Sequence, residues 1–129
     1  MKILIVDDEP LVRKSLGRAC RAKGHQVAEA SDGQQGLAMW LESEPDLVYL
    51  DVLMPGLSGP EVLNQVREYR EKASAALGRP TKTHVVLMSA YSGEHNITTA
   101  QQMGADLFIP KPFEDIFEVV TRGEELLHK

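Results

Sequence analysis

The chain lacks the features that mark secreted, membrane-bound and nucleic-acid-binding proteins. Its single cysteine, Cys20, cannot form an internal disulfide, and it lies on the apolar side of a helical pattern, which predicts a small core residue. No apolar run approaches the roughly 20 residues that span a bilayer. Met1-Lys2 leads directly into a short apolar run, without the hydrophobic region or cleavage site of a signal peptide. The formal charge of −5 argues against the basic surface of a general nucleic-acid binder. We therefore expect a cytoplasmic protein without direct contacts to membranes or nucleic acid.

Internal repeats, low-complexity tracts and interdomain linkers are also missing from the sequence. The 129 residues are 43% hydrophobic and 26% charged, an ordinary balance for a globular protein with a sizeable core. This composition predicts one domain over residues 1–129.

Strand-like and helix-like segments alternate from one end of the chain to the other. Short apolar runs predict strands at residues 2–6, 46–50, 84–88 and 106–109, and residues 26–30 form a weaker second strand, which makes five in all. Apolar residues at helical spacing predict five helices, at residues 9–23, 31–43 and 58–73, around Ile97–Met103, and from Phe113 to Leu127. Residues 74–82 contain Gly78 and Pro80 and are expected to form a loop.

Helix starts and apolar stripes refine this pattern. Ser31 with Gln34 suggests a capping box, and Ser58-Gly59-Pro60-Glu61 is a strong helix start. The third helix is expected to bury Val62, Val66, Tyr69 and Ala73, and the last helix Phe113, Ile116, Phe117, Val120 and Leu127.

Five successive strand–helix units predict an α/β fold with a five-stranded parallel sheet covered by helices on both faces. Right-handed crossovers favour a doubly wound sheet, and the flavodoxin-like strand order 2-1-3-4-5 is one known solution. In that order residues 2–6 and 46–50 form neighbouring strands, so Asp7, Asp8 and Asp51 come together.

Polar residues suited to phosphate chemistry follow four of the apolar runs. Asp7 and Asp8 follow the first run, Asp51 the third, Ser89 the fourth, and Lys111 the fifth. Carboxylates suit Mg²⁺, and three of them crowded together are unfavourable without a cation. A carboxylate can also attack phosphorus and form an aspartyl-phosphate, while a metal, an ammonium and a hydroxyl stabilise the transferred group.

Each of these residues also has a structural alternative when it is taken alone. Asp8 could cap the next helix, Asp51 could be a turn residue before Met54-Pro55-Gly56, and Lys111 could be a solvated lysine. Ser89 alone carries almost no information. The joint pattern places suitable polar groups at the carboxyl ends of four strands, and this combination favours a phosphoryl site.

At this point the chain resembles the receiver domain of two-component response regulators, the CheY-like family, over essentially its whole length. The resemblance rests on ILIVDDEP at 3–10, DLVYLDVLMPGLSGPEVL at 46–63, VVLMSAYSG at 85–93 and GADLFIPKPF at 104–113.

The resemblance implies that Asp51 accepts a phosphoryl group from a sensor histidine kinase or phosphotransfer protein. Mg²⁺ would be bound by Asp7, Asp8, Asp51 and the backbone carbonyl of Leu53. Lys111 would contact the phosphoryl group, with Lys111–Pro112 as a cis peptide. Such a domain catalyses only its own phosphorylation and dephosphorylation, so it is a signalling switch and not an enzyme with a separate substrate.

The resemblance also implies a switch at Ser89 and Phe108. Phosphorylation would act through this switch on the surface formed by the helix around 97–103, the strand at 106–109 and the last helix. That change of surface would control an output domain or partner. Homodimerisation through that surface stays open. Phe108 has no phenolic hydroxyl, so its burial should be easy, and Leu53 and Tyr91 would tune the phosphoryl lifetime. Residues 73–83 are longer than usual for the family, which predicts an extended helix or a protruding loop.

Three other functions remain open. A metal-dependent phosphohydrolase could use Asp51 as nucleophile, but no acid stands two residues later, where Leu53 is found. A flavodoxin-type electron carrier would have to bind the phosphate of a flavin beside three carboxylates that repel it. A phosphate-independent scaffold would have no need for the complete residue set.

Overall fold

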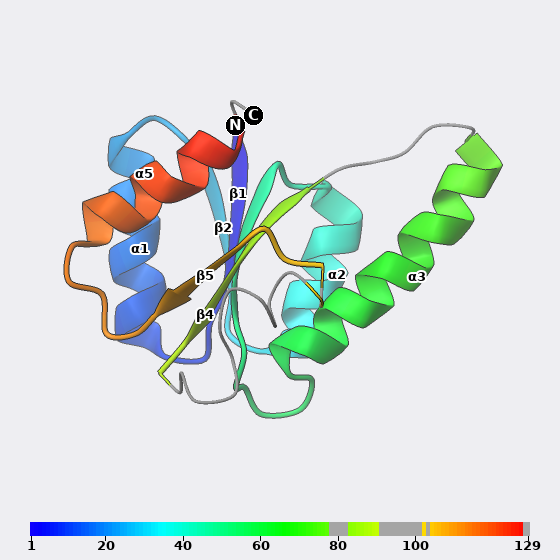
Figure 1. The fold of residues 1–129 in the computed structure, drawn as a ribbon, viewed down its shortest axis with the longest axis horizontal. Coiled ribbons are helices and arrows are strands. Elements are labelled where there is room, and N and C mark those ends of the chain that lie inside the picture. Colours follow the sequence, from blue (N-terminus) through cyan, green and yellow to red (C-terminus); the bar gives the residue numbers. More distant parts are fainter. Residues whose placement is uncertain (78–82, 91–101, 103, 128–129) are drawn as a thin grey trace.

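A parallel sheet of five strands forms the centre of the molecule (Figure 1). The computed structural model describes residues 1–77, 83–90, 102 and 104–127. The strands are β1 (Lys2–Val6), β2 (Gln26–Ala30), β3 (Leu47–Asp51), β4 (His84–Ser89) and β5 (Leu107–Pro110). Their order is β2-β1-β3-β4-β5, which confirms the predicted doubly wound topology.

The helices lie in two layers, one on each face of the sheet. They are α1 (Pro10–Ala22), α2 (Gly33–Ser43), α3 (Gly59–Leu77) and α5 (Ile116–Leu126). Figure 1 shows α1 and α5 on one side of the strands and α2 and α3 on the other. The fifth expected helix, around Ile97–Met103, falls outside the described residues apart from Gln102.

Alternation along the buried strands divides the core between these two layers. Even-numbered positions of β1, Leu4 and Val6, belong to one apolar cluster, which also contains Trp40 of α2 and Val62 of α3. The odd-numbered positions Ile3 and Ile5 belong to a second cluster, against α1 and α5. The strands are therefore apolar on both faces, as the near-continuous hydrophobic runs predict. Cys20 lies in the second cluster, which confirms that it is a core residue.

Side-chain hydrogen bonds cap the N-termini of α2 and α3, the two helices on the same face of the sheet. At α3, Ser58 Oγ accepts from the Glu61 amide at 3.3 Å and Glu61 Oε1 accepts from the Ser58 amide at 3.2 Å, which confirms that helix start. At α2 the expected pairing of Ser31 with Gln34 is wrong by one residue. Asp32 is the N-cap and accepts from the Gln35 amide at 2.8 Å, while Gln35 Oε1 accepts from the Ser31 amide at 2.8 Å. Aspartate and serine are equally good N-cap residues, so the sequence motif alone could not decide whether Ser31 or Asp32 caps the helix.

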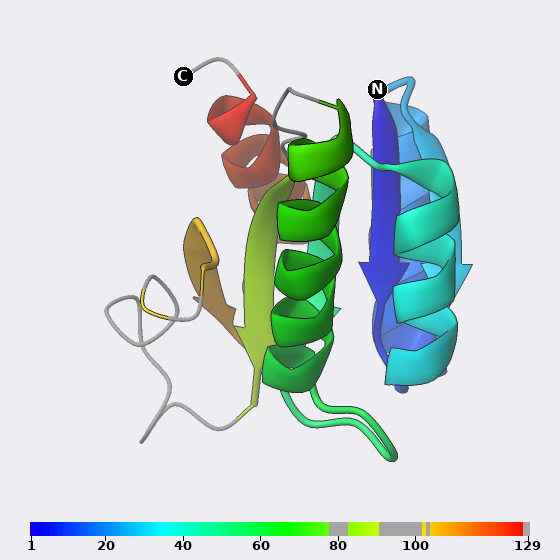
Figure 2. The same ribbon diagram turned by 90° about the vertical axis from the view of Figure 1, so that its right-hand side faces the viewer.

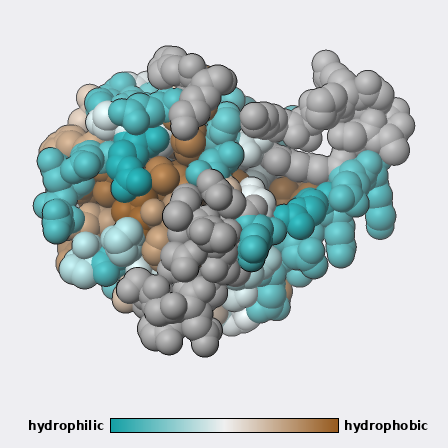
Figure 3. All heavy atoms as spheres, in the orientation of Figure 1, coloured by the Kyte–Doolittle hydropathy of each residue, from teal (hydrophilic) through white to brown (hydrophobic). Residues whose placement is uncertain are grey.

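Helix α3 is longer than the sequence pattern predicts. It continues to Leu77, so the expected loop from Ser74 begins in fact as helix. Ala73 to Ala76 contains three alanines and no β-branched residue, and alanine has the highest intrinsic helix propensity. The C-terminal half of α3 extends away from the sheet (Figures 1 and 2), and Figure 3 shows mainly hydrophilic residues along the part of α3 that is drawn in colour. This outcome agrees with the extended helix that the family resemblance suggested.

Two aromatic residues expected in helix stripes are instead exposed. Tyr69 of α3 is 51% exposed and Phe117 of α5 is 55% exposed. Val62, Val66 and Val120 from the same stripes are buried as expected. Helical spacing identifies the apolar side of a helix but does not define the edges of the apolar stripe. Whether a residue at such an edge is buried depends on the element that packs against the helix.

Candidate functional site

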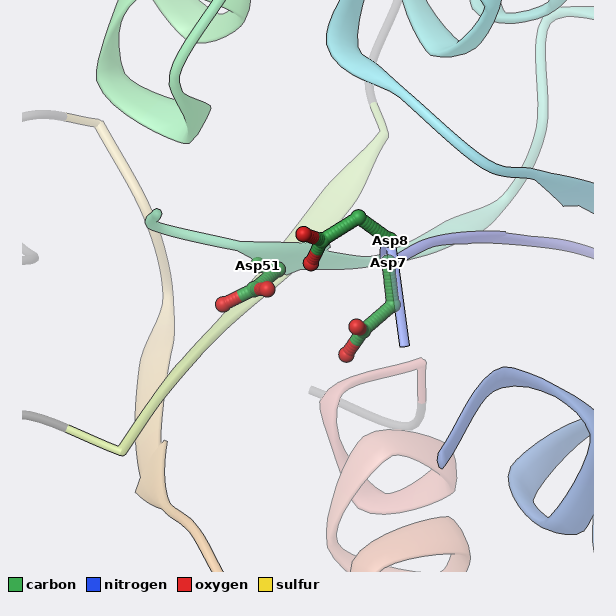
Figure 4. A group of neighbouring side chains, drawn as sticks. All are labelled: Asp7, Asp8 and Asp51. Carbon is green, nitrogen blue, oxygen red and sulfur yellow. The ribbon is translucent and has the colours of Figure 1, made fainter. Parts of the chain in front are cut away.

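Three aspartates meet at the carboxyl ends of β1 and β3. Asp7 and Asp8 follow β1 directly, and Asp51 is the last residue of β3. β1 and β3 are paired in parallel, with Val6 opposite Leu50, so the chain continues past both strands at the same edge. One carboxylate oxygen from each aspartate lies within 4.8 Å of the other two (Figure 4). The structure thus brings together the acidic residues that the predicted strand order places side by side.

The structural alternatives for single aspartates do not describe this arrangement. The N-cap of α1 is Glu9, so Asp8 is not the capping residue of that helix. Asp51 is only 4% exposed and belongs to the strand, whereas a turn residue would lie in solvent. After Asp51 the backbone turns and comes back close to the end of β3, where the amide of Gly59 donates to the Val52 carbonyl at 2.9 Å. A Cβ on Gly59 would overlap the Asp51 carbonyl, so only glycine allows α3 to begin this close to the strand end.

The acidic cluster has the character of a cation site. Asp7 is fully buried, and its Oδ2 lies 2.7 Å from the ammonium of Lys111. Burial first, and then the charge of Asp7, raises the pKa of Asp51 to about 7. Bringing these carboxylates together is therefore unfavourable unless positive charge is added. Hard oxygen ligands at this spacing could hold a divalent cation.

Lys111 supplies part of that positive charge. Its Nζ lies 2.7 Å from Asp7 Oδ2 and 3.4 Å from Asp51 Oδ2, and its side chain is only 6% exposed. Burial alone would lower the pKa of Lys111, but hydrogen bonds to Asp7 and Glu9 and the charge of Asp51 raise it above its usual range. This residue is consequently an ammonium inside the site and not a solvated lysine. The Lys111–Pro112 peptide is cis, as expected.

Glu9 is a site residue that the sequence reasoning missed. Its Oε1 lies 2.9 Å from Lys111 Nζ, although its side chain is 56% exposed. Arg13 also reaches the site, because its guanidinium donates to the backbone carbonyl of Asp7 at 2.9 Å. The acidic run Asp7-Asp8-Glu9 was a signal for Glu9. Its pairing with a residue 102 positions away depends on tertiary structure and has no local signature.

Ser89 and Phe108 lie near the same edge of the sheet. Ser89 ends β4 and is fully buried, and its carbonyl accepts from the Lys111 amide at 2.8 Å. Phe108 of β5 is 9% exposed and packs in the core cluster of the α2 and α3 face, which agrees with the easy burial expected of it. Leu53 lies two residues past Asp51 with 59% of its surface exposed, and its role as a carbonyl ligand stays a prediction. Tyr91 lies outside the described residues.

No helix in residues 1–77, 83–90 and 104–127 is both long and apolar enough to cross a bilayer.

Comparison with known proteins connects this geometry to one family. Residues 3–121 match the model of the response regulator receiver domain. The transcriptional regulatory protein ResD of Bacillus subtilis is 36% identical over 128 residues, which are 99% of this chain and 48% of ResD. The response regulator MprA of Mycobacterium tuberculosis is 33% identical over 129 residues, which are 100% of this chain and 51% of MprA. The chain thus spans about half the length of these relatives.

A solved structure with a similar fold leads to the same family. A chain of the CheX–CheY–BeF3–Mg²⁺ complex from Borrelia burgdorferi matches with a TM-score of 0.83 and 26% identity, covering 100% of this chain and 90% of that one. The family match covers β2 to β5, all of β1 after Lys2, and the whole acidic cluster with Lys111. The chain therefore belongs to the receiver domain family of two-component response regulators.

Proposed function

We propose that residues 1–129 act as a phosphorylation-controlled receiver domain in which Asp51 is the phosphoacceptor. The observation that carries the proposal is the ammonium of Lys111 seated in the acidic cluster, 3.4 Å from Asp51 Oδ2 and 2.7 Å from Asp7 Oδ2. This combination supplies a nucleophile, oxygen ligands for a cation and a fixed positive charge in one place. The phosphohydrolase and electron-carrier alternatives lose their basis, because the family is one of signalling switches.

The proposed reaction transfers a phosphoryl group between two side chains. A carboxylate oxygen of Asp51 forms a bond to phosphorus as the phosphorus–nitrogen bond of a phosphohistidine on the kinase breaks. The electron pair of that bond returns to the leaving imidazole, which takes up a proton. Lys111 stabilises negative charge on the phosphoryl oxygens during the transfer. Hydrolysis of the acyl phosphate by water later restores the Asp51 carboxylate and releases phosphate.

Mg²⁺ is the cation that this ligand set suits best. We assign its protein ligands to Asp7, Asp8, Asp51 and the backbone carbonyl of Leu53. Mg²⁺ keeps several waters and binds one or two carboxylates together with a phosphate oxygen, so when bound it would neutralise charge on both reactants. The CheX–CheY–BeF3–Mg²⁺ complex, a chain of which is similar to this one, contains this ion together with beryllium fluoride.

Ser89 and Phe108 are proposed as the switch. Ser89 would donate its hydroxyl hydrogen bond to a phosphoryl oxygen, and Phe108 would respond by filling space on the β5 side. New charge and hydrogen bonds at Asp51 would thereby favour one of two arrangements of the surface around β5 and α5.

The partners follow from this role. A sensor histidine kinase or phosphotransfer protein would donate the phosphoryl group, and the surface around β5 and α5 would control an output domain or a second protein. Relatives such as ResD, which is named a transcriptional regulatory protein, are about twice as long as this chain, so an output segment fits the comparison. We expect the domain to act in the cytoplasm, where these partners would meet it.

Incubation with a small-molecule phosphodonor and Mg²⁺ tests the proposal. We expect the mass of one phosphoryl group to be added, reversibly, to the wild-type protein. The addition should disappear with EDTA and in Asp51→Asn, because the first removes the cation and the second the nucleophile. Labelling of Asp51→Asn, or continuous turnover of a phosphate ester, would contradict the assignment; intact-mass spectrometry with a phosphate-release assay separates these results.

A further inference from the structure

Glu9 contacts the ammonium of Lys111 from outside the acidic cluster. Nζ of Lys111 has three hydrogens to donate, and three carboxylate oxygens surround it. The distances are 2.7 Å to Asp7, 2.9 Å to Glu9 and 3.4 Å to Asp51. Among the described residues, the group that could share a metal ion contains Asp7, Asp8 and Asp51 but not Glu9.

Two of these three contacts must change when the site is used as proposed. A cation would draw on oxygens of Asp7 and Asp51. A phosphoryl group on Asp51 would convert one carboxylate oxygen of that residue into the bridging oxygen of an acyl phosphate. Glu9 takes part in neither event, so its contact with Lys111 is the one that can persist through both.

We infer that Glu9 is a positioning residue that keeps the Lys111 ammonium in place for the phosphoryl group. The inference rests on the proposed function and adds a residue to it. Glu9 does not touch the phosphoryl group in this account; it acts only by limiting where Lys111 can go. Preorganised charge is more effective in such a site than charge that must be brought in during the reaction.

A second account of Glu9 makes a different prediction. If Glu9 acted only through its negative charge, it would repel an anion, and its position along the side chain would matter little. Glu9→Asp separates the two accounts. It keeps the charge but shortens the side chain by one carbon–carbon bond, about 1.5 Å, so that the 2.9 Å contact with Lys111 is lost.

Beryllofluoride is a suitable probe, because BeF3− becomes tetrahedral when it binds a carboxylate oxygen, resembles a phosphoryl group there, and needs no phosphoryl donor. We propose calorimetric titration of the wild type, Glu9→Asp and Glu9→Ala with beryllofluoride at saturating Mg²⁺. Glu9→Asp should bind it about two- to five-fold more weakly than the wild type, the range expected for a partly exposed ion pair. Glu114→Asp is a matched control, since it shortens another exposed acid three residues from Lys111.

A direct observation of the ammonium supplies the second readout. The Nζ resonance of Lys111 should be detectable by NMR in the wild type, where hydrogen bonds protect its protons from exchange. It should weaken or disappear in Glu9→Asp and stay unchanged in Glu114→Asp. The thermal midpoints and Mg²⁺ affinities of the two aspartate variants should match the wild type, which a general structural defect would not allow.

The results distinguish failure of this inference from failure of the proposed function. If the wild type binds beryllofluoride and Glu9→Asp binds it equally well, Glu9 does not position Lys111 and the inference is overturned. An unchanged Lys111 resonance in Glu9→Asp overturns it too. If the wild type does not bind beryllofluoride with Mg²⁺, the proposed function and the inference fall together.

Discussion

At the level of single residues, Asp51 is surrounded by groups that affect its protonation in opposite directions. Burial and the neighbouring charge of Asp7 raise its pKa, whereas Lys111 lowers it, and the net result is a pKa of about 7. The usual pKa of an aspartate in an unfolded chain is about 3.9. In the proposed function Asp51 is a nucleophile and must be ionised, so a cation bound at this site would both hold the phosphoryl group and favour the ionised form of Asp51.

This shift has a consequence for the stability of the metal-free protein. Between about pH 4 and pH 7 the folded state holds a proton on Asp51 that the unfolded state has lost. The folded state therefore binds more protons in this window, and the free energy of unfolding falls as the pH rises through it. Above about pH 7 the loss is complete and this contribution becomes constant.

We expect Asp51→Asn to remove this dependence. In EDTA at pH 8 the variant should be more stable than the wild type by roughly 1–3 kcal/mol, because a buried carboxylate beside Asp7 is replaced by a neutral amide. At pH 4 the two proteins should be nearly equal. Urea unfolding followed by the fluorescence of Trp40, the sole tryptophan, measures both values. A wild type that is the more stable protein at pH 8 would show that Lys111 outweighs burial and Asp7.

At the level of elements, side-chain hydrogen bonds and ion pairs join α5 to the rest of the domain at two places. Tyr49 of β3 donates its buried hydroxyl to the Val119 carbonyl of α5 at 2.9 Å. At the other end, Glu124 of α5 accepts from Lys23 and contacts His25 Nε2, both at 2.7 Å. Burial alone would raise the pKa of Glu124, but the bonds from Lys23 and His25 lower it. These contacts join α5 to β3, which carries Asp51, and to the turn between α1 and β2.

Tyr49 and Gly123 form a matched pair across this interface. A Cβ on Gly123 would overlap the Tyr49 hydroxyl and approach Leu47 Cδ2 at 2.8 Å. The glycine is therefore required by the size of the tyrosine, and it carries the helix-propensity cost of about 1 kcal/mol that glycine brings. A smaller residue at position 49 would relax that requirement.

A double-mutant cycle measures this coupling. Gly123→Ala should destabilise the protein by about 1–3 kcal/mol through overpacking, and Tyr49→Leu should destabilise it through a lost hydrogen bond and a cavity. The double variant should be more stable than the sum of the two effects implies, by about 1 kcal/mol, because the alanine fills part of the space. Additive effects in denaturant unfolding would mean that the two residues do not depend on each other.

At the level of the whole molecule, the site and the surface proposed to respond to it are joined through neighbouring strands. β4, which ends at Ser89, pairs with both β3 and β5, so it lies between the strand of Asp51 and the strand of Phe108. The bond from the Lys111 amide to the Ser89 carbonyl, 2.8 Å long, extends this connection to the segment that precedes α5. In the proposed function, a change at Asp51 would reach β5 and α5 through these neighbouring strands and this hydrogen bond.

We expect Ser89→Ala to separate phosphorylation from this response. The variant should still be labelled on Asp51, because Ser89 is neither the nucleophile nor a member of the carboxylate cluster. It should fail to transmit the change, because the hydroxyl that would follow the phosphoryl group is gone. Amide hydrogen exchange with and without beryllofluoride and Mg²⁺ tests this: residues 107–110 and 116–126 should respond in the wild type only. An equal response in both proteins would remove Ser89 from the switch.

The fold and most of the proposed site could be predicted from the sequence. The strands at residues 2–6 and 26–30 were predicted at their observed bounds, the first from a continuous apolar run, which is a local signal, and the second from a weaker pattern. Asp7, Asp8 and Asp51 could be grouped because the strand order places β1 beside β3. The errors lie at element margins, such as the cap at Asp32 and the end of α3 at Leu77, where several residues fit the same pattern.

The sequence by itself determined the alternation of strands and helices, the parallel sheet and the residues at its carboxyl edge. These features depend on the spacing of apolar residues and on the order of the elements, both of which can be read from the sequence. Only the tertiary structure decided that Glu9 contacts Lys111, that Tyr49 reaches α5, and that Phe117 and Tyr69 stay exposed. Such contacts join residues far apart in sequence, and their energies depend on distances and burial that exist only once the layers have packed.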